Sequence, residues 1–73
     1  MILTEAHYNF LKSNEVFLGN VTTTKDIIEY FFHIYNQVTG ENRPVTGCGR
    51  CVANVEKRLK IEITKYEDYR DRH

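Results

Sequence analysis

The sequence has no long apolar run, and this limits where the chain is expected to work. Its most apolar segment, residues 27–35, is broken by Glu29 and His33 and is far shorter than the roughly 20 residues that span a membrane. The first residues contain neither the positively charged start nor the long hydrophobic stretch of a secretory signal peptide, so we expect no such peptide. We therefore expect no membrane association and a location inside a cell.

Cysteine is also scarce, with only Cys48 and Cys51 in the 73 residues. Small secreted domains usually depend on several disulfides that connect distant parts of the chain. Two cysteines three positions apart provide no such framework. Their number and spacing favour a reducing compartment.

The residue patterns that mark common enzymes are missing as well. The sequence shows no Ser–His–Asp order, no pair of catalytic carboxylates and no phosphate-binding loop. Residues 47–49, Gly-Cys-Gly, lack the lysine that a P-loop requires. We therefore expect that the protein is not an enzyme and has no small-molecule substrate.

The composition suits one small packed domain that covers residues 1–73. Hydrophobic residues make up 41% of the chain and aromatic residues 12%, which is too many for a disordered chain. A chain this short buries only about 60% of the surface that it exposes when unfolded, so its core is marginal. Pairing with a partner or a second copy would add to such a core.

Helix-capping residues and apolar spacing predict two helices before residue 40. Thr4 is a suitable N-cap for a helix over about residues 5–12. Three threonines at residues 22–24 offer caps for a second helix over about residues 24–39, and Gly40 suits the left-handed position that ends it. The second helix is apolar over a wide arc, so we expect it in the middle of the fold. Its apolar residues are Ile27, Ile28, Phe31, Phe32, Ile34, Tyr35 and Val38.

A third helix is predicted over about residues 48–66, with a strand as the alternative for part of it. Val52, Val55, Leu59, Ile63 and Tyr66 recur at helical spacing. Residues 59–64 also alternate as a strand does, and the apolar connector at 15–21 is either a short extended segment or its only available partner strand. We favour the helix because its stripe is unbroken, and we expect residues 67–73 to fray. The expected fold is all-α, a small three-helix domain.

Positive and negative charges balance over the whole chain, but positive charge is concentrated on one side of the predicted third helix. Ten basic and ten acidic residues cancel, yet eight of the basic residues follow residue 41. At 100° per residue, the side opposite the apolar stripe contains Arg50, Asn54, Lys57, Arg58, Ile61 and Lys65.

This helix side has three possible meanings. A basic helix that follows another helix is typical of DNA-binding helix-turn-helix proteins, although the connector from Gly40 to Gly47 exceeds their turn of roughly three or four residues. The exposed apolar residue Ile61 instead indicates a protein contact. The plainest interpretation is a solvated amphipathic surface. We take these residues as candidate contacts for a protein partner, with nucleic acid as the alternative.

Cys48-Gly49-Arg50-Cys51 is the most specific motif in the sequence. At the start of a helix, the dipole and Arg50 would favour a thiolate, as in dithiol redox sites. Such sites are most convincing beside a β-α-β unit, which is not expected here. The pair could instead supply half of a zinc site, completed by His7 and His33. We favour two reduced cysteines that pack at the helix start, without a metal or cofactor.

Several segments together carry a family likeness. They are residues 34–42 (IYNQVTGEN), 46–51 (TGCGRC), 58–60 (RLK) and 3–8 (LTEAHY). With these segments the chain resembles small proteins of tailed bacteriophages, especially phages that infect Bacteroidetes. The resemblance implies a phage-encoded accessory protein in the host cytoplasm or a minor virion component, and it assigns no functional residue. We therefore expect a protein–protein interaction module whose partner is a phage protein, a host factor or a second copy.

Overall fold

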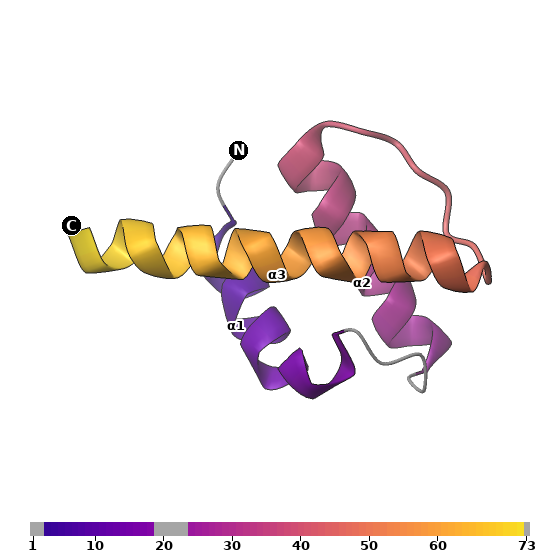
Figure 1. The fold of residues 1–73 in the computed structure, drawn as a ribbon, viewed down its shortest axis with the longest axis horizontal. Helices are drawn as coiled ribbons and strands as arrows, with labels where there is room; N and C mark the ends of the chain where they lie inside the picture. Colours follow the sequence, from indigo (N-terminus) through magenta and orange to yellow (C-terminus); the bar gives the residue numbers. More distant parts are fainter. Residues whose placement is uncertain (1–2, 19–23, 73) are drawn as a thin grey trace.

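The computed structural model describes residues 3–18 and 24–72, and most of these residues are helical (Figure 1). The elements are α1 (Glu5–Ser13), the short 3-10 helix η1 (Glu15–Phe17), α2 (Lys25–Thr39) and α3 (Gly49–Arg72). No strand occurs within the described ranges, so the prediction of a small all-α domain with three α-helices is confirmed. The strand alternative for residues 59–64 is wrong, because these residues lie in the middle of α3.

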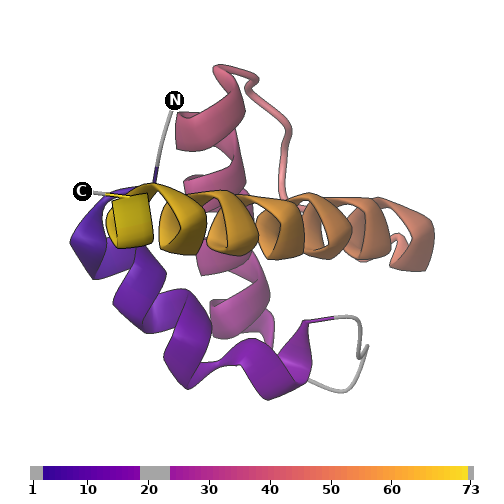
Figure 2. The same ribbon diagram turned by 60° about the vertical axis from the view of Figure 1, so that its left-hand side comes forward.

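α3 is the longest helix and lies across both of the others, as Figures 1 and 2 show. α1 packs against its C-terminal half, and α2 crosses it nearer the N-terminal half. The expectation that the second helix occupies the middle is therefore wrong: α3 is the helix that packs along both others. α2 still supplies much of the core, because its wide apolar arc faces α3 on one side and α1 on another.

The hydrophobic core lies where α1 and α2 meet the inner side of α3. Every member of the predicted third-helix stripe up to Ile63 is buried, and Tyr66 is packed against the core. Burying one such side chain stabilises the fold by about 1.5–3 kcal/mol relative to leaving it in water. The buried apolar residues are Leu3, Tyr8, Leu11, Leu18, Phe31, Phe32, Ile34, Tyr35, Val38, Val52, Val55, Leu59 and Ile63.

The first two helices begin and end as local chemistry predicts. Thr4 Oγ1 accepts the backbone N–H of His7 at 3.1 Å, and Thr24 Oγ1 accepts that of Ile27 at 3.3 Å. Gly40 ends α2 with a φ of 77°, the left-handed conformation that glycine adopts without strain. Each contact satisfies a backbone group that the helix itself leaves without a partner.

α3 continues to Arg72, so the prediction that residues 67–73 fray is wrong for residues 67–72, and His73 lies outside the described residues. Contacts with α1 hold these last turns in place. The hydroxyl of Tyr8 donates a hydrogen bond to Glu67 Oε2 at 2.7 Å, and its ring stacks on that of Tyr66 with centroids 4.5 Å apart. The guanidinium of Arg70 lies 5.0 Å from the Tyr8 ring centroid, a cation–π contact.

The expected extended segment at 15–21 is wrong over its first residues, which form η1. The backbone N–H of Phe17 donates to Asn14 O at 2.9 Å, and that of Leu18 donates to Glu15 O at 3.0 Å, so this part of the chain is a tight helical turn. Leu18 leaves the turn with extended backbone and is buried. Residues 19–21, like the possible caps at 22 and 23, lie outside the described residues.

None of the helices in the described ranges combines the length and the apolar character needed to cross a lipid bilayer.

Candidate functional site

The outward side of α3 carries the six candidate contact residues, and we call this set the basic face. It comprises Arg50, Asn54, Lys57, Arg58, Ile61 and Lys65, all exposed except Arg58, which is half-buried. Ile61 is 46% exposed, whereas its near neighbour Leu59 is 0% exposed. The 100° spacing of an α-helix therefore distinguished the exposed side of α3 from its core residues.

Arg58 differs from the other members because a buried carboxylate holds its side chain. Its Nε donates to Glu62 Oε2 at 2.8 Å, and Glu62 is only 3% exposed. The pKa of Arg58 is raised, first by this hydrogen bond. Lys65 Nζ lies 3.7 Å from the same oxygen. The positive charge of Arg58 is thus partly neutralised, and Arg50 and Lys57, which form no ion pair with a described residue, are the more available cations.

Both acidic residues of α3 before residue 65 are buried. Glu56 is 1% exposed and Glu62 is 3% exposed. Neither therefore presents a carboxylate on the basic face, and its net charge is positive. The burial of these two residues was not predicted from the sequence, although a signal was present: at 100° per residue, Glu56 falls beside Val52 and Glu62 falls beside Val55.

The connection between α2 and α3, residues 40–48, is held against α2. The Asn36 side chain exchanges two hydrogen bonds with the Arg43 backbone, each 3.0 Å long. Glu41 accepts the Tyr35 hydroxyl at 2.6 Å and the Arg43 Nε at 3.0 Å. These two hydrogen bonds, the one from Tyr35 first, lower the pKa of Glu41. The connection therefore has a defined path, which places the start of α3.

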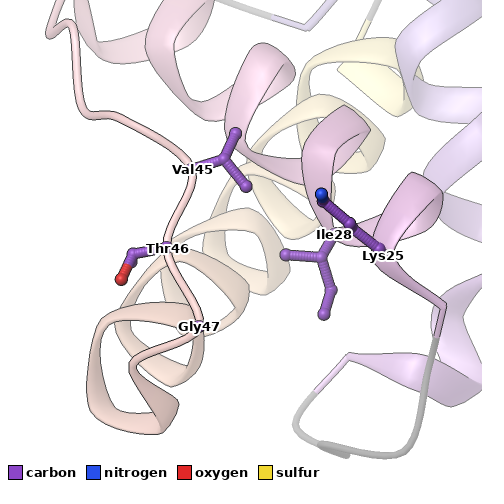
Figure 3. A pocket seen from close by; sticks show the side chains of 5 residues that line it. All are labelled: Lys25, Ile28, Val45, Thr46 and Gly47. Carbon is purple, nitrogen blue, oxygen red and sulfur yellow. The ribbon is translucent and has the colours of Figure 1, made fainter.

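Two open hollows lie beside this connection. The larger, of about 470 Å³, is lined by Lys25, Ile28, Val45, Thr46 and Gly47, and Val45 points toward α2 across it (Figure 3). The smaller, of about 270 Å³, is lined by Phe32, Arg43, Pro44, Thr46 and Cys51. The smaller hollow brings a thiol next to aromatic and cationic side chains.

The two cysteines occupy different environments. Cys48 is exposed, whereas Cys51 is half-buried. The interpretation of both as packing residues is therefore wrong for Cys48. The Cys51 backbone N–H donates to Cys48 Sγ at 3.4 Å, so the sulfur acts as the N-cap acceptor of α3.

Hydrogen bonding also makes the two thiols chemically unequal. The pKa of Cys48 is lowered, first by a hydrogen bond from the Cys51 thiol and then by the backbone N–H of Cys51. The pKa of Cys51 is raised by the same thiol hydrogen bond, by burial and by the Cys48 charge. Cys48 is thus the thiol that ionises first, and Cys51 is the donor that stabilises its thiolate.

The four side chains considered for zinc do not converge. His7 and His33 lie close together, with ring centroids 5.9 Å apart, where α1 faces α2. The cysteines lie at the N-terminal end of α3, whereas α1 packs on its C-terminal half (Figure 1). Among residues 3–18 and 24–72, no three His, Cys, Asp or Glu side chains are grouped to hold a metal ion. In the described part of the chain, the histidine pair and the cysteine pair therefore do not form one group.

No protein-family model matches the chain, and neither a curated protein nor a solved structure matches it.

Proposed function

We propose that the protein is a non-enzymatic interaction module that binds an acidic protein surface through the basic face of α3. The observation that carries this proposal is the separation of charge on α3. Arg50, Lys57 and Lys65 are exposed, while the carboxylates of Glu56 and Glu62 are buried. Over residues 50–65 this side of α3 therefore exposes only positive charge, which favours a partner of the opposite sign. The exposed carboxylate of Asp68, paired with Arg72, marks the end of this positive stretch.

The position of Ile61 indicates a protein partner more than a nucleic acid. Residues three or four positions away are its neighbours on the helix surface, and these include Lys57, Arg58 and Lys65. An apolar side chain surrounded by cations resembles the centre and rim of a protein interface. The matching surface would have an apolar pocket bordered by aspartate or glutamate.

The shape of α3 supports the same proposal. Its 24 residues make a rod of about 36 Å, and α1 and α2 cover only its inner side. A long helix with one open side suits docking along a groove or against another helix.

The likeness to tailed-phage proteins supports a biological setting for the module. We infer a phage-encoded accessory protein whose partner is a virion protein or a host factor that it inhibits. The corresponding locations are the host cytoplasm or the virion.

The test uses a probe peptide with glutamate and leucine at helical spacing, titrated into isotope-labelled protein and followed by NMR. We expect shifts at Lys57 and Ile61, and at least about tenfold weaker binding for Lys57→Glu. Lys25→Glu on α2 is the matched control and should bind as the wild type does. Binding that leaves α3 unshifted, or equal affinities for both variants, would refute the proposal.

A small nucleic-acid-binding domain is the second candidate, because Arg50, Asn54 and Lys57 are exposed together on the first turns of α3. Phosphate binding would release counterions, so affinity for duplex DNA would fall steeply with salt. Lys57→Ala should then reduce the slope of log affinity against log salt by about one. Duplex and single-stranded probes that cause no NMR shift at low salt would eliminate this candidate.

A further inference from the structure

We propose that Cys48 and Cys51 form a dithiol site that exchanges with small disulfides, in which Cys48 is the nucleophile and Cys51 the resolving thiol. The co-reactant is a low-molecular-weight disulfide that carries carboxylates. This site adjoins the basic face at Arg50 but does not depend on the function proposed for that face.

The backbone already has the geometry that a disulfide needs. The Val52 N–H donates to Cys48 O at 3.0 Å, so both cysteines belong to the first turn of α3. Residues three apart in a helix have Cα atoms about 5 Å apart, inside the range of roughly 4.4–6.8 Å found in disulfides. Cys48 Sγ also lies 3.4 Å from the Cys51 backbone nitrogen, so the first sulfur is folded back toward the second residue.

The different solvent exposure of the two thiols determines which of them attacks a dissolved disulfide first. Cys48 is open to solvent, whereas Cys51 is half-buried in the wall of the smaller hollow, next to Phe32 and Pro44. A dissolved disulfide therefore reaches Cys48 first. The sheltered thiol of Cys51 is protected from other reagents and remains one helical turn away from the mixed disulfide.

Electrostatics agree with this order. The N-terminus of a 24-residue helix, the Cys51 N–H and the Cys51 thiol all stabilise a thiolate on Cys48. The positive charges of Arg43 and Arg50 favour ionisation of Cys51. Arg43 also lines the smaller hollow, where the guanidinium nitrogens other than Nε, which donates to Glu41, would attract a carboxylate of the co-reactant.

The reaction balances in two steps. The Cys48 thiolate attacks one sulfur of the disulfide RSSR, which forms a mixed disulfide and releases one thiolate that takes up a proton. Cys51 then loses its proton and attacks the Cys48 sulfur, which closes the protein disulfide and expels the second thiolate, again protonated by solvent. Two protein thiols are oxidised and RSSR is reduced to two molecules of RSH.

The test incubates the reduced protein with oxidised glutathione and a chelator, and follows whole-protein mass. We expect the wild type to lose two hydrogens and Cys51→Ser to retain one glutathione on Cys48. Cys48→Ser should react about tenfold more slowly than Cys51→Ser at neutral pH, because its remaining thiol is half-buried and a dissolved disulfide reaches it less easily. Serine is a good N-cap, so the start of α3 survives the change, which circular dichroism verifies.

Two results would refute the proposed dithiol site. One is an equal rate of reaction with oxidised glutathione for the two serine variants, and the other is a wild-type protein that retains bound glutathione and does not form the Cys48–Cys51 disulfide. Reversibility is checked with reduced glutathione, which should restore both thiols.

Discussion

Asn36 and Arg43 are joined by two hydrogen bonds: the Asn36 Nδ2 donates to the Arg43 carbonyl oxygen, and the Asn36 Oδ1 accepts the Arg43 backbone N–H, each at 3.0 Å. One amide side chain on α2 thereby satisfies both backbone groups of a residue seven positions later. This pairing replaces the regular structure that residues 40–48 lack. It also sets the direction from which the chain enters α3.

Asn36→Ala should therefore destabilise the fold by about 1–2 kcal/mol, because two backbone groups lose their partner at a half-exposed site. Chemical denaturation monitored by circular dichroism measures the change. The exposed neighbour Gln37 provides the control, and Gln37→Ala should alter stability by about 0.5 kcal/mol or less. Similar losses at both positions would show that the paired hydrogen bonds contribute little.

Leu59 and Ile61 should respond differently to truncation, although only two positions separate them. Leu59→Ala removes a fully buried side chain and should cost about 2–5 kcal/mol, enough to unfold much of a domain this small. Ile61→Ala should change stability by about 0.5 kcal/mol or less, because its side chain is 46% exposed. Thermal melting of both variants is the measurement. Equal, large losses would contradict a continuous α3.

The contact between Tyr8 and Glu67 should make the end of α3 sensitive to acid. The pKa of Glu67 is lowered from 4.5, first by the hydrogen bond from the Tyr8 hydroxyl. A lowered pKa in the folded state contributes stability above the unfolded pKa, and this contribution is lost as pH falls through the folded pKa. The protection factors of the amides in the last turns of α3, which compare their exchange with that of the unfolded chain at the same pH, should therefore fall below about pH 4.5.

Tyr8→Phe is the matched change for this contact, since it keeps the ring and removes the hydroxyl. The Glu67 carboxyl, followed by NMR, should then titrate at a higher pH than in the wild type. The stack on Tyr66 should persist, with helical content preserved at neutral pH. An unchanged Glu67 titration would mean that Lys12 and Arg70, the cations nearest to it, control its pKa.

We expect Arg58 to contribute to the stability of the fold and Lys57 to contribute to partner binding. Arg58→Met leaves the buried Glu62 carboxylate without its hydrogen bond, so thermal stability should fall, by less than for Leu59→Ala. Adding Glu62→Leu should recover most of that loss. Lys57→Ala should leave stability unchanged and weaken partner binding. If Arg58→Met leaves the melting temperature unchanged, the ion pair has no structural role.

Local signals in the sequence accounted for the helices and for the division of α3 into two sides. Thr4, Gly40 and the stripe from Val52 act over one or two turns, and such interactions can be read from spacing alone. The last turns of α3 could not be predicted in this way, because they depend on Tyr8, which lies 59 positions before Glu67. The position of α3 across both other helices is likewise a result of packing between distant segments.

In the candidate sites too, features set by local spacing could be predicted from the sequence, and features set by packing between distant segments could not. Helical periodicity alone identified the exposed residues of the basic face, including Ile61. Burial of Glu56 and Glu62 depends on what α1 and α2 leave covered, and a charged residue beside an apolar stripe is usually read as exposed. The motif of Cys48 and Cys51 was visible in the sequence, but their unequal exposure was not, because it depends on the path of residues 40–48.

The attachment of α1 to the far end of α3 also determines when this fold can be completed during translation. As the chain leaves the ribosome, residues 5–13 emerge long before residues 66–70, which provide the ring and charges around Tyr8. Until then α1 lacks its principal partner and is too short to be stable alone. α2 and the first turns of α3 can meet earlier, since fewer residues separate them. The nascent chain therefore closes its fold late, when its most distant segments first come together.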